Sequence, residues 1–227
     1  MRGLKWLAVA LLFVAGIARA DSLAQGVIAY SKGDYATAIV TLRPLAEAGD
    51  SSAQGLLSVM YERGQGVPKD FQKALYWSRK AADAGNAAAQ SSLGAKYHSG
   101  QGVPRDYERA AAWWKLAAEQ ENEDAQYFLG VSYQRGKGVS KDLQLAASWY
   151  RKAADHGHSR AQCLLASLYA KGEGVPKDDQ LAYFWLLLCS VDGDPNTRRI
   201  RDLIESDLTN EQRIAAQLKA REWAPRP

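Results

Sequence analysis

The sequence lacks the compact motifs that identify many hydrolytic and redox enzymes. It contains no H-E-x-x-H, C-x-x-C, G-x-S-x-G or S-x-x-K pattern, which excludes the short signatures of zinc proteases, redox dithiols, α/β-hydrolases and serine β-lactamases. No run of 18 apolar residues follows the N-terminal segment, so a multi-span membrane protein is excluded as well. Because 47% of the 227 residues are hydrophobic and 24% are charged, the chain is not disordered either.

Residues 1–20 have the pattern of a secretory signal peptide. Arg2 and Lys5 precede an apolar stretch at 6–17, and the segment ends on the small residue Ala20. The apolar stretch has 12 residues, fewer than the roughly 20 that a helix needs to span a bilayer. We therefore expect cleavage after Ala20, a periplasmic or secreted protein, and no stable membrane span once the signal is removed.

The mature chain lacks an excess of either charge. The whole sequence has a formal net charge of +4, but removal of Arg2, Lys5 and Arg19 leaves 26 basic residues against 25 acidic ones. A net charge of +1 gives no electrostatic reason to expect a nucleic-acid partner.

A spacing of 36 residues runs through the chain and indicates stacked helical units. Each unit begins with an Ala-Gln pair, followed by a leucine and, four residues later, a tyrosine. The pairs begin at Ala53, Ala89, Ala125 and Ala161; the leucines are Leu57, Leu93, Leu129 and Leu165; the tyrosines are Tyr61, Tyr97, Tyr133 and Tyr169. This spacing places the marks on one face of a first helix.

A loop with two glycines follows each first helix. The glycines are Gly64 and Gly66, Gly100 and Gly102, Gly136 and Gly138, and Gly172 and Gly174. We expect the first glycine to end the helix in a left-handed conformation and the second to let the chain reverse. An aspartate then follows in every unit, where its side chain can cap a second helix: Asp70, Asp106, Asp142 and Asp178.

The second helix repeats an alanine, a tryptophan and a small residue at offsets of three and four, which predicts a single buried face. The tryptophans are Trp77, Trp113, Trp149 and Trp185. Trp113 and Trp149, in the middle of the stack, are expected to be the most sensitive to truncation. Gly85, Gly157 and Gly193 end this helix, whereas Glu121 occupies that place in the second unit and predicts a shifted cap or backbone strain.

These marks resemble the Sel-one-like repeat (SLR), a relative of the tetratricopeptide repeat. The clearest copy carries Ala89, Leu93, Gly94, Tyr97, Gly100, Gly102, Val103, Asp106, Ala110, Trp113, Ala117 and Ala118. The resemblance implies an all-α fold, a right-handed α/α superhelical solenoid of helical hairpins. The expected division is a tetratricopeptide-like cap at 21–52, repeats at 53–88, 89–124, 125–160 and 161–196, and a C-terminal helical cap at 197–227.

The resemblance also implies a protein or peptide partner rather than catalysis, with no cofactor, and we expect a monomer. In related solenoids the first helices form the binding face. The candidates on that face are Glu62, Arg63, His98, Tyr127, Gln134, Arg135 and Lys171. Arg63, Arg135 and Lys171 share one repeat position and form a basic row suited to an acidic or C-terminal carboxylate. The alternative is a solvated row that only complements helix dipoles.

A different class of function stays open at this point, a cell-wall glycan or peptidoglycan binder that regulates an envelope enzyme. Tyr127 and whichever of Trp113 and Trp114 is exposed would supply ring stacking for it. An enzyme built from residues distant in sequence is the third alternative.

Two further pairs of residues invite a chemical interpretation. His156 and His158 flank a glycine, but without nearby carboxylates they are expected to be surface residues rather than metal ligands. Cys163 and Cys189 lie in one repeat, at helix ends that antiparallel packing brings together, so a disulfide is one alternative in an oxidising compartment. Because the other repeats have alanine where Cys189 stands, a buried free thiol is the favoured interpretation.

Overall fold

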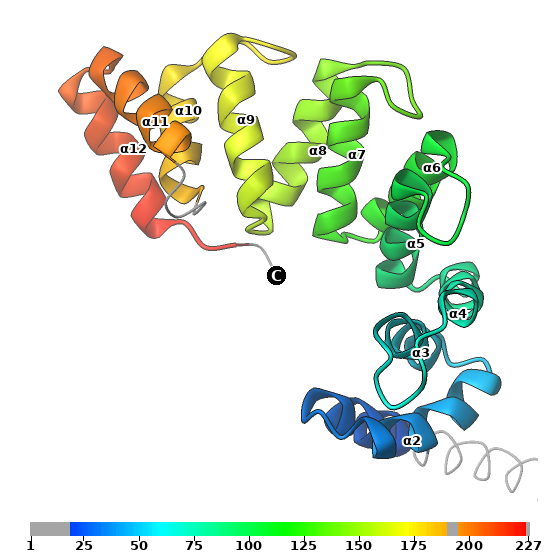
Figure 1. Ribbon diagram of the computed structural model, residues 1–227. Coiled ribbons are helices and arrows are strands. Elements are labelled where there is room, and N and C mark those ends of the chain that lie inside the picture. Colours follow the sequence, from blue (N-terminus) through cyan, green and yellow to red (C-terminus); the bar gives the residue numbers. More distant parts are fainter. Residues whose placement is uncertain (1–18, 190–194, 226–227) are drawn as a thin grey trace, which may run out of the picture. The chain divides into compact units, whose positions relative to one another are not determined.

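The computed structural model describes residues 19–189 and 195–225, and every regular element within these residues is a helix (Figure 1). All but the last two residues of the expected signal peptide lie outside this part, as do Gly193 and Asp194. None of the described helices is long and apolar enough to cross a membrane. The chain divides into two compact units, residues 1–93 and 94–227, which are described separately.

The first unit contains the expected N-terminal hairpin and the first repeat. Residues 19–31 are helical, and α2 (Tyr35–Glu47), α3 (Ser51–Arg63) and α4 (Phe71–Asp83) follow. Helix α2 packs on α3, and α3 packs on α4 (Figure 1). Leu42, Leu57 and Met60 are fully buried between these helices. Helix α5 (Ala87–Ser99) begins in this unit and ends in the next.

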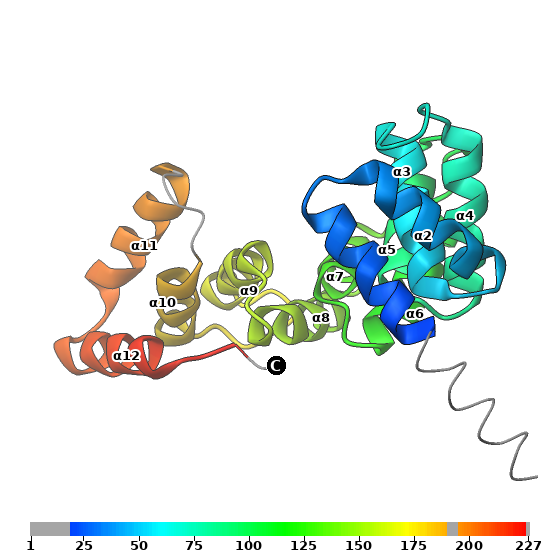
Figure 2. The ribbon, with the colours of Figure 1, turned by 90° about the horizontal axis from the view of Figure 1, so that it is seen from below.

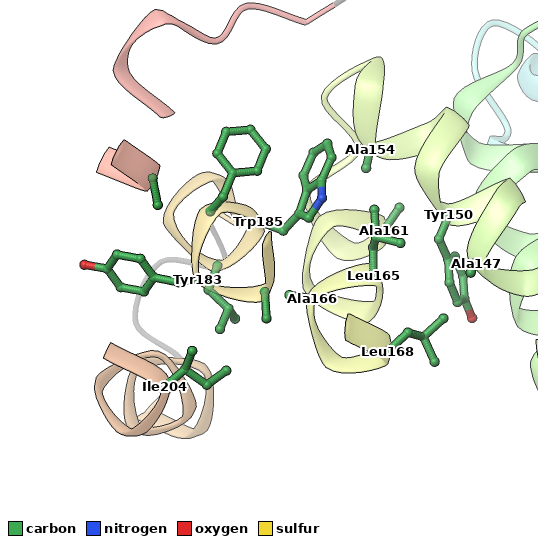
Figure 3. Close-up of a cluster of buried hydrophobic side chains, with 14 of the residues drawn as sticks. Ala147, Tyr150, Ala154, Ala161, Leu165, Ala166, Leu168, Tyr183, Trp185 and Ile204 are labelled. Carbon is green, nitrogen blue, oxygen red and sulfur yellow. The ribbon is translucent and has the colours of Figure 1, made fainter. Parts of the chain in front are cut away.

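The second unit continues the hairpins and ends in two capping helices. Its elements are α6 (Tyr107–Glu119), α7 (Glu123–Arg135), α8 (Leu143–Asp155), α9 (Ser159–Lys171), α10 (Asp179–Leu188), α11 (Pro195–Asp207) and α12 (Asn210–Glu222). Consecutive helices from α6 to α10 pack on one another, and α10 also contacts both α11 and α12 (Figure 2). Tyr150, Leu165 and Trp185 lie in the core that these helices share (Figure 3).

The predicted aspartate caps of the second helices are confirmed. Asp142 accepts a hydrogen bond from the Leu145 backbone N–H at 2.9 Å and begins α8, and Asp70, Asp106 and Asp178 cap their helices in the same way. Helix α12 begins at a capping box, in which Thr209 and Gln212 each accept a hydrogen bond from the other's backbone N–H. A side-chain oxygen at each of these sites satisfies a backbone donor that the helix itself leaves free.

The double-glycine loops also serve the contact between consecutive repeats. Gly136 ends α7 in the left-handed region with φ 65°, as predicted for the first glycine. The second glycine, Gly138, lies so close to the carbonyl of Tyr107 that a Cβ there would overlap it. Glycine at the second place of the loop therefore permits a close approach of the backbone of the preceding repeat as well as the reversal of the chain.

Glu121, which stands where the other repeats have glycine, has a left-handed backbone conformation after α6. Its φ is 65°, whereas Gly49, Gly85 and Gly157 have φ of 90°, 86° and 93° at the equivalent place. The second of the two predicted outcomes is therefore correct, because the cap keeps its left-handed conformation and a non-glycine residue accepts the strain.

The predicted tryptophan face is wrong by one residue. Trp113 and Trp149 are only half-buried, while the residues that follow them, Trp114 and Tyr150, are 2% and 0% exposed. An α-helix turns by about 100° per residue. In each of these helices, the alanines seven and eight residues after the first buried alanine both face the core. The centre of the buried face therefore lies four residues after that first alanine, at Trp114 and Tyr150, and not three residues after it. Trp113 and Trp149 lie at the edge of that face.

One hydrogen bond recurs at every joint between consecutive hairpins. The glutamine of each Ala-Gln pair donates from Nε2 to an alanine carbonyl eight residues earlier, at the end of the preceding helix. The four bonds are Gln54 to Ala46 at 3.0 Å, Gln90 to Ala82 at 3.1 Å, Gln126 to Ala118 at 3.3 Å and Gln162 to Ala154 at 3.2 Å. The glutamines are buried, so the same polar contact fixes each joint.

Candidate functional site

Three of the predicted binding residues occupy the last position of a first helix. Arg63 ends α3 in the first unit, and Arg135 and Lys171 end α7 and α9 in the second. All three side chains are exposed. A cation at a helix C-terminus is favoured by the helix dipole whether or not a ligand is present, so position alone does not distinguish the two interpretations of the row.

Two of the predicted residues, His98 and Arg135, belong to a larger group: His98 contacts Tyr107, and the charge of Arg135 acts on His98. The His98 ring meets the Tyr107 ring at 5.2 Å and the Trp114 ring at 5.5 Å. Arg105 donates from Nη1 to the Tyr107 hydroxyl at 3.3 Å, and Lys137 Nζ lies 5.1 Å from the centre of the Tyr107 ring. We call His98, Arg105, Tyr107, Arg135 and Lys137 the Tyr107 cluster.

The charges of the Tyr107 cluster act on its own titratable groups. Burial is the main cause that lowers the pKa of His98, and the positive charges of Lys137, Arg105 and Arg135 lower it further. The hydrogen bond from Arg105 lowers the pKa of Tyr107. His98 is therefore neutral at pH 7, and the positive charge of the cluster comes from its two arginines and its lysine.

A hollow of about 720 Å³, open to solvent, lies between the start of α6 and the loop after α7. Arg105 and Tyr107 line it, together with the carboxylates of Asp106 and Glu108. Asp106 is already engaged, because it caps α6 and pairs with Arg109 Nε at 3.2 Å. Arg105 is the cation among these lining residues, and Arg135 and Lys137 are the chain neighbours of Gly136, which also lines the hollow. These three cations outnumber the remaining carboxylate, Glu108, so this surface suits an anionic group.

Sequence reasoning did not identify Arg105, Tyr107 or Lys137. A signal for Arg105 is present, because a basic residue precedes the capping aspartate in every repeat: Lys69, Arg105, Lys141 and Lys177. Lys137 has no such signal, since glutamine or glutamate occupies its place in the other repeats. Its contribution depends on the contact between the loop after α7 and the start of α6 in the preceding repeat.

Tyr127 and Gln134, also predicted for the binding face, are engaged inside the second unit. The Tyr127 ring stacks on His158, with centroids 4.5 Å apart and planes inclined by 19°. Gln134 Oε1 accepts a hydrogen bond from the Tyr150 hydroxyl at 2.8 Å. Glu62, on α3 of the first unit, is half-buried.

The aromatic residues considered for glycan stacking offer little open ring surface. One face of Tyr127 is covered by His158, and Trp114 stacks on Phe128 with centroids 5.0 Å apart. Trp113 is half-buried. These rings therefore leave little surface for stacking on a sugar.

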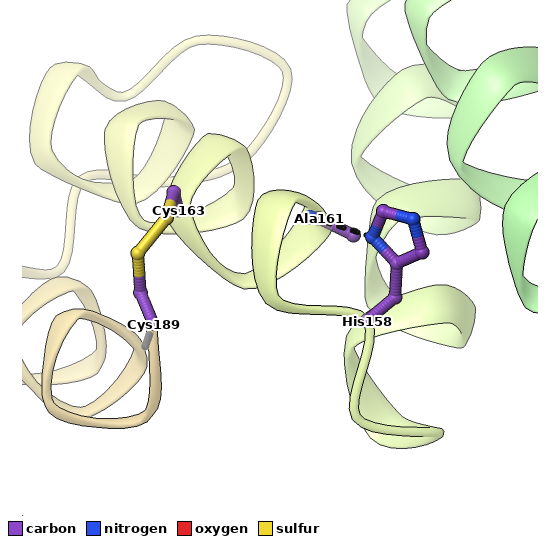
Figure 4. The surroundings of a disulfide bond; sticks show 4 residues. All are labelled: His158, Ala161, Cys163 and Cys189. Carbon is purple, nitrogen blue, oxygen red and sulfur yellow. Dashed lines mark hydrogen bonds between the residues drawn. A yellow bond between two sulfur atoms is a disulfide. The ribbon is translucent and has the colours of Figure 1, made fainter. Parts of the chain in front are cut away.

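His158 has a structural role in the described part of the chain. Its Nδ1 accepts a hydrogen bond from the Ala161 backbone N–H at 3.2 Å and so begins α9 (Figure 4). Its Nε2 lies 3.4 Å from Asp124 Oδ1. His156 is the residue that follows α8. The described residues contain no group of three or more histidine, cysteine or acidic side chains placed to hold a metal ion.

Cys163 and Cys189 are joined in a disulfide that links α9 to the residue after α10 (Figure 4). The favoured interpretation of a buried free thiol is therefore wrong. The alanine at the equivalent place in other repeats indicated a small packing position, but the pairing of α9 with α10 brings the two Cα atoms within 5.3 Å. That separation lies inside the range that a disulfide spans.

The comparisons with known proteins agree with this architecture. A family model of the Sel1 repeat matches residues 51–86, 87–122, 123–158 and 159–188. Among solved structures, the chain is similar to a Sel1 repeat protein from Oxalobacter formigenes, with 28% identity and a TM-score of 0.75, over 89% of this chain and 85% of that one. No curated protein sequence matches.

Two further solved structures show the same fold. The protein c5321, a protective antigen of uropathogenic Escherichia coli strains displaying an SLR fold, is 30% identical with a TM-score of 0.58. That match covers 90% of this chain but only 53% of c5321. A sel1 repeat protein from Klebsiella pneumoniae subsp. pneumoniae is 23% identical with a TM-score of 0.52, over 82% of this chain and 93% of that one, which bears on the fold alone.

Proposed function

Because this chain belongs to the Sel1 repeat family, whose members are generally non-catalytic interaction scaffolds, we propose that it is a non-enzymatic adaptor that binds a segment of another protein. The observation that carries the proposal is the Tyr107 cluster. Arg105 and Lys137 contact one half-buried aromatic ring beside an open hollow, at the contact of two repeats, and Arg135 adds a third positive charge that acts on the neighbouring His98. An acidic segment or a C-terminal carboxylate is the ligand chemistry that this surface complements.

The geometry of Arg105, which is not a member of the basic row, supports binding at the Tyr107 cluster. A side chain that only complements a helix dipole has no need of a specific partner, whereas Arg105 lies outside any helix and is held by the Tyr107 hydroxyl. A guanidinium fixed in this way presents its remaining donors in a defined direction. This favours recognition of a planar carboxylate.

The experiment compares partner capture by the wild-type protein and by a double variant, Arg105→Glu with Arg135→Glu. The partner is identified by crosslinking in an envelope extract followed by mass spectrometry. We expect the recovered partner to fall by about tenfold or more, and wild-type capture to weaken as salt is raised. Lys115→Glu, an exposed cation on α6 outside the Tyr107 cluster, is the matched control. Equal capture by the double variant and the control contradicts the proposal.

We further propose that the protein works in the periplasm after removal of residues 1–20. The apolar stretch at 6–17 supports export, and the disulfide between Cys163 and Cys189 supports an oxidising compartment. The intact mass of the protein recovered from the periplasmic fraction should correspond to a chain that begins at Asp21. A full-length mass in the cytoplasmic fraction alone contradicts this location.

A further inference from the structure

The first repeat contains a cavity that the described residues do not fill. It has a volume of about 250 Å³ and lies between α3, α4 and the start of α5, within the first unit. Gly55, Leu56 and Val59 of α3 line one side, Ser78 of α4 lines another, and Ser92 of α5 lies at the exposed edge. A Cβ at Gly55 would meet no atom within 4 Å, which agrees with open space at this point.

One buried side-chain oxygen among the residues that line this cavity has no hydrogen-bond partner. Ser78 is 1% exposed, and its hydroxyl makes no hydrogen bond. The carbonyl of Ala74, one helical turn earlier, instead accepts a hydrogen bond from Ser58 Oγ at 2.8 Å. A buried hydroxyl without a partner is costly, by about 1 to 3 kcal/mol, so the site favours an occupant that can hydrogen-bond to it.

The equivalent space in the following repeats is occupied by aromatic rings of the chain itself. Trp114 and Tyr150 stand where Ser78 stands in the first repeat, and Phe128 stands where Ser92 stands. In the second unit the Trp114 ring stacks on the Phe128 ring, 5.0 Å apart and inclined by 15°. In the first repeat both positions of this pair are serines, Ser78 and Ser92. The helices α3, α4 and α5 are present as in the other repeats, but the two stacked rings are missing.

The first and third repeats also differ at the position of Gly55. Tyr127 occupies this place two repeats later, and its ring lies 6.2 Å from that of Tyr150. With Gly55 and Ser78 together, the first repeat lacks both rings that fill this space in the third. A cavity of about 150 Å³ is known to accept benzene, so a 250 Å³ space is large enough for a ring.

We propose that this cavity, the Ser78 pocket, receives an aromatic side chain of the partner polypeptide, whose ring N–H or O–H hydrogen-bonds to Ser78 Oγ. The inference rests on the proposed adaptor function and gives the partner a second, apolar point of contact. Aromatic residues are the usual anchors of protein interfaces, because they bury a large area in a pocket at a small entropic cost. The site takes from the partner the kind of side chain that other repeats supply internally.

The test uses N-acetyl-tryptophanamide as the probe and needs no identified partner. In a nitrogen-15 correlation titration, we expect saturable shifts at Leu56, Val59 and Ser92. The variant Ser78→Trp copies the residue of the second repeat, fills the space, and should weaken binding by about tenfold or more while it raises the melting temperature. No shifts at these residues, or the same shifts in Ser78→Trp, would overturn the proposal.

A second variant covers the case in which Ser78→Trp does not fold. Ser92→Phe copies Phe128 at the exposed edge and should also block the probe, whereas Ser99→Phe, on the same helix but outside the pocket, should not. Shifts with free indole but none with N-acetyl-tryptophanamide would overturn the polypeptide occupant and assign the pocket to a small aromatic molecule. Because no partner is used, these outcomes are independent of the Arg105 and Arg135 experiment.

Discussion

At the scale of single residues, Glu121 shows the cost of replacing a repeat glycine. Its left-handed backbone is unfavourable for a side chain with a Cβ, by roughly 1 to 2 kcal/mol. We expect Glu121→Gly to raise the free energy of unfolding by about 1 kcal/mol, measured by urea denaturation. The contrasting change Ala112→Gly, at an exposed position in the middle of α6, should lower it by about 1 kcal/mol. A loss of stability in both variants contradicts this account.

Tyr150 makes a separate prediction about alkaline pH. Burial raises the pKa of Tyr150 well above its usual value of about 10, so the folded protein keeps the hydroxyl protonated while the unfolded chain ionises. The unfolded state then binds fewer protons, and stability falls as pH rises above about 10, by up to ~1.4 kcal/mol per pH unit.

The variant Tyr150→Phe isolates this effect. At neutral pH it should cost about 1 kcal/mol, because the hydrogen bond to Gln134 is lost. Above pH ~10 its stability should fall less steeply than that of the wild type, because the group that titrates is absent. Urea unfolding curves over this range provide the measurement, and parallel slopes in the two proteins contradict the assignment.

At the scale of elements, the buried face of the second helix predicts different roles for two adjacent tryptophans. Trp114 is 2% exposed and stacked on Phe128, while Trp113 is half-buried. We expect Trp114→Ala to destabilise the protein by about 3 to 5 kcal/mol and Trp113→Ala to cost clearly less. Thermal unfolding of the two variants checks the order, and the reverse order would restore the tryptophan face expected from sequence.

Helix starts give a second prediction at this scale. Asp142→Ala removes the acceptor for the Leu145 N–H at the start of α8 and should lower the free energy of unfolding by about 1 kcal/mol. Asp83→Ala, at the end of α4, removes the same kind of side chain where a negative charge is unfavourable, so it should be neutral or slightly stabilising. Chemical denaturation distinguishes the two.

The elements could be predicted from sequence because their signals are local. A capping aspartate, a helix-ending glycine and a buried leucine each act within one hairpin, so repetition makes them plain. The tryptophan face could not be fixed in the same way, because offsets of three and four suit the edge of a buried face as well as its centre. Trp113 satisfies the pattern, yet Trp114 fills the core.

At the scale of the whole molecule, the disulfide predicts a redox-dependent stability. Cys163 and Cys189 are 26 residues apart in sequence, and closing such a loop stabilises the folded state by about 3 kcal/mol. Reduction should therefore lower the urea midpoint of the wild type and leave that of the double variant Cys163→Ala, Cys189→Ala unchanged. Alkylation of the unfolded, unreduced protein should add no label, and labelling of both cysteines would contradict the bridge.

The two sites depend on relations between repeats, which limits what sequence can predict. Arg135 and His98 could be proposed from their helix register, but Lys137 and Tyr107 join them only through the contact of the loop after α7 with the start of α6. The Ser78 pocket is defined by what the first repeat lacks in comparison with the next two. An aligned sequence shows the serines, and the structure is needed to show that nothing else fills the space.

The recurring glutamine bond has a consequence for how such a chain can change in length. Each joint uses the same donor and the same alanine carbonyl, so a duplicated copy of residues 123–158 would meet compatible partners at both of its ends. A gene duplication of one unit would thus keep this hydrogen bond at both of the joints that it creates. The chain can thus lengthen or shorten by one 36-residue repeat at a time while each joint keeps its hydrogen bond.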